Sequence, residues 1–255
     1  MIHTRHPTGG DIPALGALWK EAFGDPDVFL DSFFRCAFAE KRSLCLIENG
    51  EIAAALYWFD CSWNGMSLAY LYAVSVAEAH RGRGLCRRLL TDTHAHLSAR
   101  GYTGVILVPG NASLFDLYAH LGYCICSSVD EFRCDAADSG IPLHKIDADA
   151  YAALRLRFLP EGSVWHAREN LQFLALHSEL YAGENFILAA HRENGALTAD
   201  EFLGDRLSAP HILHELGCTH GVFRTEGEER PFAMYLSLRE DITAMPRYFG
   251  IAFDG

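Results

Sequence analysis

The stretch VSVAEAHRGRGLCRRLL, residues 74–90, joins a short apolar run to an amphipathic helix through two glycines set among arginines. The pattern places Gly82 and Gly84 at the N-terminus of that helix. Unpaired backbone N–H groups point outward there and carry roughly half a unit of positive charge. Because glycine has no β-carbon, an anion can approach the backbone closely. With four arginines adding formal charge, the stretch predicts a binding site for a polyphosphate; they are Arg81, Arg83, Arg87 and Arg88.

Two common phosphate-binding motifs do not fit these residues. The dinucleotide-binding fingerprint GxGxxG needs a glycine where Arg87 stands, and the P-loop pattern GxxxxGK followed by Ser or Thr is absent. The pattern R-x-x-G-x-G/A does fit from Arg81 to Cys86, with the small Cys86 in place of the final Gly or Ala.

A second stretch, NASLFDLYAHLGY at residues 111–123, places Asn111 seven residues before Tyr118 and ends on Gly122-Tyr123. With the loop and the opening TGGDIPALGALWKEAF, residues 8–23, it makes residues 1–134 resemble the GNAT superfamily of acyl-CoA N-acyltransferases. The resemblance implies an α+β fold, an α/β/α sandwich with a mixed, mostly antiparallel sheet.

The resemblance also implies roles for particular residues. In the family, the strand before the loop binds the pantetheine arm and one of its N–H groups polarises the thioester carbonyl; these roles fall on Val74, Ser75 and Val76. Asn111 would hydrogen-bond the arm, and Tyr118 matches the position that often protonates the departing thiolate. The loop expected to hold the pyrophosphate consists of Arg81, Gly82, Arg83, Gly84, Leu85, Cys86 and Arg87.

Simpler interpretations stay open beside these. Arg83, Arg87 and Arg88 could form a solvated helix face, Tyr118 could be a core residue, and Asn111 could be only the N-cap of a helix.

The general base is not evident. Some members of the family carry a glutamate where this chain has Tyr70, and a phenol with a pKa near ~10 is a poor base at neutral pH. Water, a backbone carbonyl or a group from the second half of the chain could serve instead. The C-terminal carboxylate of Gly255 is one candidate.

The composition of the chain excludes some classes of binding partner. The net charge of -12 argues against a nucleic-acid binder, and no apolar run approaches the ~20 residues of a membrane span. The N-terminus lacks the pattern of a signal peptide, so we expect a cytoplasmic protein with its eight cysteines reduced. No metal is expected, because His211, His214, Cys218 and His220 complete no ligand pattern of recognised spacing.

A change in composition at residues 135–142 predicts a linker, hence a GNAT N-acetyltransferase domain over residues 1–137 and a smaller α+β domain over residues 138–255. We expect helices near 148–158 and 165–181 and a final strand over 247–254. The second domain is either a degenerate GNAT-like copy that cannot bind coenzyme A or an unrelated cap.

Together these features predict an acetyl-CoA-dependent N-acetyltransferase in which a neutral primary amine attacks the thioester directly within a ternary complex. The acceptor would be a small-molecule amine or a peptide amine. Another acyl donor or a hydroxyl acceptor stays possible, and the sequence does not reveal the oligomeric state. The alternative from a different class is a non-catalytic CoA-binding module with a regulatory or sensor role.

Overall fold

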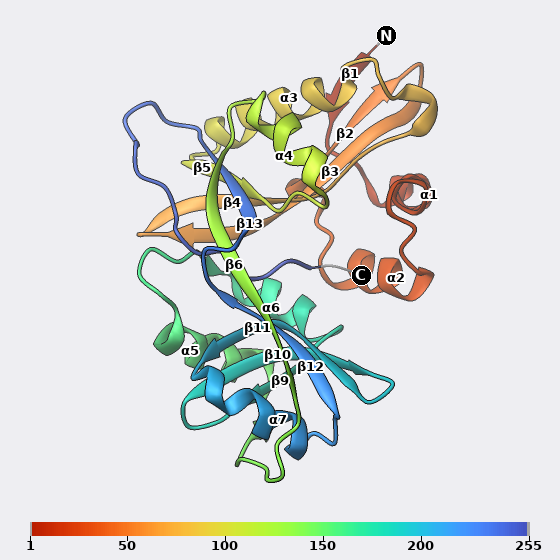
Figure 1. Cartoon of the computed structure of the whole chain (residues 1–255). Coiled ribbons are helices and arrows are strands. Elements are labelled where there is room, and N and C mark those ends of the chain that lie inside the picture. Colours follow the sequence, from red (N-terminus) through yellow and green to blue (C-terminus); the bar gives the residue numbers. More distant parts are fainter. Residues whose placement is uncertain (1, 254–255) are drawn as a thin grey trace. The chain divides into compact units, whose positions relative to one another are not determined.

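The computed structural model describes residues 2–253, which divide into two compact units (Figure 1). The first unit contains the described residues up to 124 together with residues 234–245, and the second contains residues 125–233 and 246–253. The boundary predicted after residue 137 does not coincide with these units, because the strand that ends at Asp135 already belongs to the second unit. Gly255, considered above as a base, lies outside the described residues.

The first unit is a mixed sheet with helices packed on it. Its strands, in spatial order, are β1 (Ile2–Arg5), β2 (Ser43–Glu48), β3 (Glu51–Trp63), β4 (Met66–Val76), β5 (Gly104–Leu107) and the end of β13 (Arg230–Ser237). Only β4 and β5 run parallel; the other neighbouring pairs are antiparallel. The helices are α1 (Ile12–Phe23), α2 (Asp27–Cys36), α3 (Leu85–Ala99) and α4 (Ala112–Ala119). The predicted fold class, with its mixed and mostly antiparallel sheet, is confirmed.

Alternation along β3 explains why both faces of this sheet are covered. Side chains of successive strand residues point to opposite faces. Trp58 therefore joins the buried cluster that contains Leu89 of α3. Tyr57 faces the other way and contacts Trp19 of α1 and Phe33 of α2, with ring centroids 5.3 Å and 4.9 Å apart. The order of the chain thus places α3 and α1 on opposite sides of β3.

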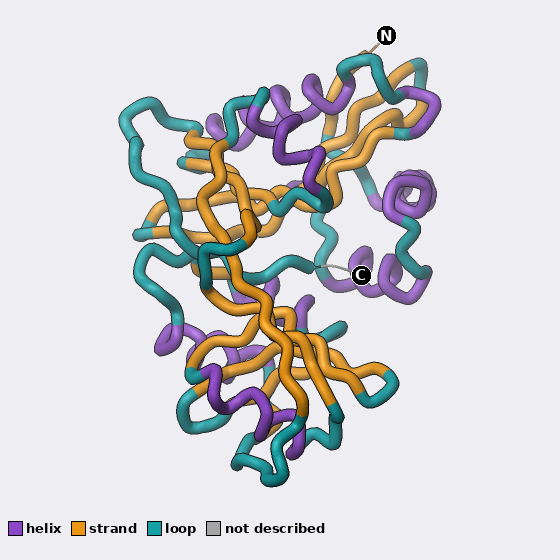
Figure 2. The backbone as a smooth tube through the Cα atoms, viewed as in Figure 1, coloured by secondary structure: helices purple, strands orange, loops and turns teal. Residues whose placement is uncertain are grey.

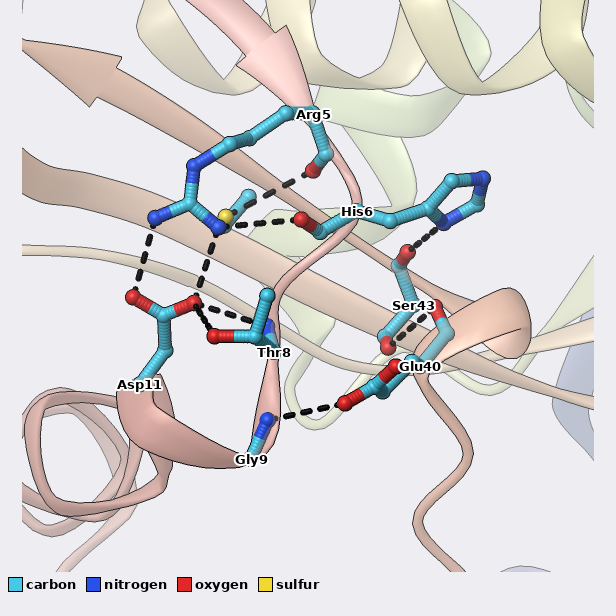
Figure 3. A network of polar contacts seen from close by, with 8 residues as sticks. Arg5, His6, Thr8, Gly9, Asp11, Glu40 and Ser43 are labelled. Carbon is cyan, nitrogen blue, oxygen red and sulfur yellow. Dashed lines mark hydrogen bonds and ion pairs between the residues drawn. The ribbon is translucent and has the colours of Figure 1, made fainter.

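A polar network fixes the chain where it passes from β1 into α1 (Figure 3). The Arg5 guanidinium donates to both oxygens of Asp11, over 2.8 Å and 2.9 Å. The backbone N–H and hydroxyl of Thr8 donate to the same carboxylate, and the Gly9 N–H donates to Glu40 at 2.8 Å. Arg5 and Thr8 hold the pKa of Asp11 well below its usual range, so the network stays ionised at neutral pH.

The second unit is also a mixed sheet. Its strands, in spatial order, are β6 (Cys124–Asp135), β12 (His220–Glu226), β11 (Ala196–Gly204), β10 (Phe186–Glu193), β9 (Glu179–Ala182) and β7 (His144–Lys145). The short strand β8 (Trp165–His166) lies outside this order. Its helices are α5 (Ala148–Phe158), α6 (Arg168–Leu174) and α7 (Ala209–Glu215). Among residues 2–253, no helix of either unit is both long enough and apolar enough to span a bilayer.

Both units contain helices as well as strands (Figure 2), and both repeat one order of these elements along the chain. A strand, two helices and three antiparallel strands are followed by a helix and a strand that runs parallel to the last of those three. In each unit that final strand gains an antiparallel neighbour from a distant part of the sequence: β13 pairs with β5, and β6 pairs with β12. The second half therefore has the topology of the first.

Two sequence predictions for the second unit are wrong. The helix predicted over 165–181 is only α6, because residues from Glu179 onward pair with β10 as strand β9. The predicted strand over 247–254 is not formed up to Phe253, the last described residue; Tyr248 makes an isolated bridge to Ser163. Its hydroxyl donates to the buried Glu201 at 3.0 Å. The predicted helix over 148–158 is confirmed as α5.

Candidate active site

Strand β4 parts from β5 before it ends. The parallel ladder between them stops at the Tyr70–Ile106 pair, and β4 then continues to Val76. Ala73, with a φ of 48°, lies where the register with β3 shifts. A bulge of this kind bends and twists a strand. Beyond Tyr70, the edge of β4 that faces away from β3 is therefore paired with no other strand in the described chain.

Val74, Ser75 and Val76, predicted to hold the thioester, form the last residues of β4. The Ser75 Oγ donates to the Ala55 carbonyl of β3 at 3.3 Å. The N–H of Ala77, one residue past the strand, also donates to β3, over 2.9 Å. Because backbone groups alternate between the two edges of a strand, the N–H of Val76 points away from β3, to the open edge.

The loop between β4 and α3 presents a row of unpartnered amides. Gly82 and Gly84 have φ angles of 72° and 75°, and a Cβ at either would meet nothing within 4 Å. The left-handed backbone, and not crowding, is thus what favours glycine here. Within the described residues, the N–H groups from Gly82 to Arg87 donate to no protein acceptor; the Arg88 N–H is the first to bond, to the Gly84 carbonyl at 3.1 Å. Unpartnered amides at the N-terminus of a helix, here one of 15 residues, are an arrangement with which proteins commonly bind anions.

The arginines around this loop differ in what they contact. The Arg81 Nε donates to the Val76 carbonyl at 3.1 Å and ties the loop to the end of β4. Arg88 extends away, to the Ile2 carbonyl at 3.1 Å. Arg87 is exposed, and its guanidinium has no partner among residues 2–253. Arg81 and Arg87 therefore offer positive charge to a ligand at the loop.

Arg83 is paired within the protein. Its two terminal nitrogens donate to the two oxygens of Glu48, over 2.6 Å and 2.8 Å. His80 lies 2.7 Å from the same carboxylate. Arg83, and secondarily His80, lowers the pKa of Glu48 from its ordinary value. Sequence reasoning missed this cluster, since Glu48 is 35 residues from Arg83.

Leu85 and Cys86 anchor the helix below the loop. Leu85 is buried in the cluster that contains Leu89, and Cys86 packs against it. Burial raises the pKa of the Cys86 thiol, so this side chain stays neutral. Of these two residues, the backbone N–H groups are therefore what a ligand would contact.

Tyr118 projects from α4 into the same cluster. Its side chain is buried, and its ring lies 5.5 Å from that of Tyr123 in an edge-on arrangement. Burial, with a smaller effect of the Cys86 thiol, raises the pKa of Tyr118 far above its usual range. Its hydroxyl has no hydrogen-bond partner among the described residues. The Tyr118 hydroxyl is thus protonated, and no acceptor in the described chain uses its proton.

A histidine that the sequence did not single out holds the neighbouring tyrosine. His94 Nε2 lies 2.7 Å from the Tyr123 hydroxyl. Burial lowers the pKa of His94 to about 4, so the ring is neutral near pH 7 and its Nε2 can accept a hydrogen bond from the Tyr123 hydroxyl. This contact fixes Tyr123 against the ring of Tyr118.

Asn111 caps α4, as the simpler interpretation predicted. Its Oδ1 accepts from the Ser113 N–H at 3.1 Å and from the Ser113 hydroxyl at 2.7 Å. The residue is exposed, and its side-chain NH₂ group has no partner among residues 2–253. It can therefore still donate to a ligand.

Tyr70, the residue at the position where some family members carry a glutamate, packs in the protein core. It is 2% exposed, and its ring stacks on Phe59 with centroids 6.0 Å apart. Tyr70 is thus part of the aromatic core on the α1 side of the sheet.

The histidines of the second unit have structural partners. The Nδ1 atoms of His211 and His214 lie 2.8 Å and 2.9 Å from the carbonyls of Ser139 and Ala137. Across the described chain, no three His, Cys, Asp or Glu residues are grouped to hold a metal ion.

Comparison with known proteins places this arrangement in a family. Residues 3–126 match the family described as the acetyltransferase (GNAT) domain. No curated protein matches the chain.

Several solved structures share its fold. A GCN5-related N-acetyltransferase from Anabaena variabilis has a TM-score of 0.73 and 15% identity, over 94% of this chain and 73% of its own. A GCN5-related N-acetyltransferase from Kribbella flavida has a TM-score of 0.70 and 16% identity, over 93% of this chain and 72% of its own. A tandem GNAT protein from the clavulanic acid biosynthesis pathway is similar over 95% of this chain and all of its own, with 10% identity and a TM-score of 0.55. The family match, on a domain whose loop and strand edge have the geometry described above, shows that residues 3–126 form an acetyltransferase domain of the GNAT superfamily.

Proposed function

We propose that this protein is an acetyl-CoA-dependent N-acetyltransferase that transfers the acetyl group to a primary amine by direct attack in a ternary complex. The observation that carries the proposal is the row of unpartnered amides from Gly82 to Arg87, directly after a strand whose far edge is open. Six N–H groups with no protein acceptor suit a pyrophosphate. The open edge of β4 suits an extended, amide-containing arm that pairs with a strand.

The chain's own residues would divide the work as follows. The open edge over Val74, Ser75 and Val76 holds the arm, and the N–H of Val76 points where it can stabilise negative charge on the thioester oxygen. Arg81 and Arg87 supply charge beside the loop. Asn111 donates its free NH₂ group to the arm.

The transfer forms a C–N bond and breaks the C–S bond of the thioester. The amine loses a proton to water or to a base yet to be identified, and the departing sulfur takes its proton from Tyr118. Burial raises the pKa of Tyr118, so its phenol is protonated at neutral pH and can donate its proton there. The acceptor is a small-molecule amine or a peptide amine.

The second unit, by its matching topology, would be a degenerate GNAT copy that binds no coenzyme A. Its turn after β11 lacks the glycine pair of the first unit.

Turnover separates this proposal from a non-catalytic CoA-binding module. Thiol release from acetyl-CoA is followed with a panel of small amines, polyamines and peptides, and acetylated products are identified by mass spectrometry. The proposal predicts amine-dependent thiol release with one acetylated amine formed per thiol. Tight acetyl-CoA binding without release for any amine would favour the sensor alternative.

A further inference from the structure

We propose that Glu48 is a positioning residue that holds the loop between β4 and α3 in its anion-binding conformation, and that Arg83 acts through Glu48 and not on the phosphate. The inference deepens the proposed function and rests on it for the identity of the ligand. It assigns to a residue of β2, outside both sequence motifs, control over affinity for the acyl donor.

The contacts of Glu48 set it apart from an ordinary surface ion pair. Its side chain is 7% exposed, while that of Arg83 is 49% exposed. Arg83 binds it through two parallel hydrogen bonds, and His80 adds a third contact at 2.7 Å. Paired bonds from one guanidinium fix geometry as well as adding energy, whereas most exposed ion pairs contribute little.

The two partners of Glu48 stand on either side of Gly82 in the chain. His80 ends the short 3-10 helix Glu78–His80, and Arg83 lies between the two left-handed glycines. One carboxylate therefore links residues 80 and 83, which flank Arg81 and Gly82. His80 and Arg83 also approach each other, with 3.2 Å between Nδ1 and Nη1.

Other contacts fix the two ends of the loop: at its junction with α3 the Arg88 N–H donates to the Gly84 carbonyl, and two contacts fix its start. The Ala77 N–H is bonded to β3, and Arg81 is bonded to the Val76 carbonyl. Neither constrains Gly82 or Gly84. Glycine explores more backbone conformations than other residues, so the two glycines would leave the amides of Gly82, Arg83 and Gly84, which precede the helix, pointing in different directions unless a neighbour restrained them. Glu48 supplies that restraint from β2 before any ligand arrives, which lowers the ordering cost of binding.

The same contacts change the expected role of Arg83. Its charge lies against a carboxylate at hydrogen-bond distance, so its field at a phosphate is offset. Its main role is therefore to link the loop to Glu48. Arg87, with no partner among the described residues, is the arginine whose charge acts on the phosphate.

A double-mutant cycle tests this assignment. Acetyl-CoA affinity, steady-state kinetics and amide hydrogen exchange over Gly82–Arg87 in the free protein are measured for Glu48→Gln, Arg83→Gln and the double variant. Glu51→Gln is the matched control, because Glu51 is an exposed carboxylate on the same hairpin. Thermal unfolding checks each variant.

Each single variant should weaken acetyl-CoA binding about tenfold, as expected for loss of a charge-assisted hydrogen bond. The double variant should lose no more than the larger single effect. KM for acetyl-CoA should rise while kcat at saturation holds, exchange of the loop amides should quicken, and Glu51→Gln should change nothing.

The assignment would be overturned if the loss of acetyl-CoA affinity in the double variant equalled the product of the two single losses. Unchanged hydrogen exchange of the loop amides in Glu48→Gln would also overturn it. If Glu48→Gln does not fold, Arg83→Gln, at a half-exposed position, decides by its exchange alone. A wild type that binds no acyl-CoA would contradict the proposed function, yet the exchange measurement would still decide whether Glu48 holds the loop.

Discussion

The two units of this chain share a topology and differ at the turn that follows their central strand. In the first unit the turn carries Gly82 and Gly84 in left-handed conformations, and its amides have no acceptor among the described residues. In the second, Asp205 follows β11 and its carboxylate accepts from the Leu207 N–H at 3.0 Å. Arg206 is bound to Asp130 at 2.8 Å. One turn is open to an anion, and the other satisfies its own donors.

The strands before these turns, β4 and β11, also differ in whether their polar groups are used within the protein. Ser75 of β4 and Glu201 of β11 are the first ladder residues past a shift in register. Ser75 is small and bonds a neighbouring carbonyl, whereas Glu201 is fully buried and binds Arg155 of α5 over 2.7 Å and 2.8 Å. The second unit uses this position for internal stability. A shared fold thus carries a ligand site only where the local residues leave backbone groups free.

The largest expected effect concerns this buried pair. Arg155→Met leaves the Glu201 carboxylate uncompensated in the interior, with Tyr151 and Tyr248 as its remaining partners. Breaking such a pair costs about 3–5 kcal/mol of unfolding free energy, measurable by urea denaturation. Arg168→Met, which removes an exposed pair with Asp149, is the control and should cost under ~1 kcal/mol. Equal losses in the two variants would show that burial does not distinguish the pairs.

Removal of one hydroxyl in the first unit should affect chemistry and not folding. Tyr118→Phe keeps the buried ring but removes the proposed proton donor, so kcat should fall about 10²–10⁴-fold. Acetyl-CoA affinity should stay close to that of the wild type. A kcat within a factor of two of wild type would exclude Tyr118 as the general acid.

The two turns can be compared through their arginines. Arg87→Gln should weaken acetyl-CoA binding about tenfold, in the range of one charged hydrogen bond, and the loss should shrink at high salt. Arg206→Gln, at the corresponding turn of the second unit, should leave binding unchanged. Calorimetric titrations at two salt concentrations measure both, and an equal effect of the two substitutions would remove the distinction between the turns.

The last expected effect is a pH dependence of stability, which is absent at neutral pH. His94 has a pKa of about 4 in the folded protein, below the ~6.5 of an unfolded chain. The unfolded state therefore binds the proton first as pH falls, so His94 costs nothing above pH ~6.5 and lowers stability progressively down to pH ~4. The difference in unfolding free energy between wild type and His94→Gln should shift against the wild type over this range. A difference that stays constant from pH 7 to pH 4 would contradict the burial of His94.

The sequence predicted local features well. Asn49-Gly50 indicated the β2–β3 hairpin, and the glycine pair indicated a backbone open to an anion, because both depend on conformations that only a few residue types adopt readily. The motif that singled out Asn111 and Tyr118 is also local, because both residues lie on α4 or at its N-cap; their roles stay predictions.

Long-range relations were not predictable in the same way. Glu48, His80 and Arg83 meet only because β3 pairs with both β2 and β4 and so brings the end of β2 within reach of the loop that follows β4; no local pattern marks them. The pairing of β13 with β5 was also missed, since a strand leaves no trace in its own sequence of which distant edge it joins. The helix predicted over 165–181 failed because pairing with β10 decided the state of Glu179–Ala182.

Acetyl-CoA titration with determination of stoichiometry tests the central claim most directly. Calorimetry is performed on the wild type, on Gly84→Asp and on Leu207→Asp, which places the same carboxylate at an exposed position of the corresponding turn in the second unit. Free coenzyme A and NADH serve as comparison ligands. The account predicts one acetyl-CoA bound per chain, binding abolished by Gly84→Asp and unchanged by Leu207→Asp. Two bound per chain, or binding that survives Gly84→Asp, would contradict it.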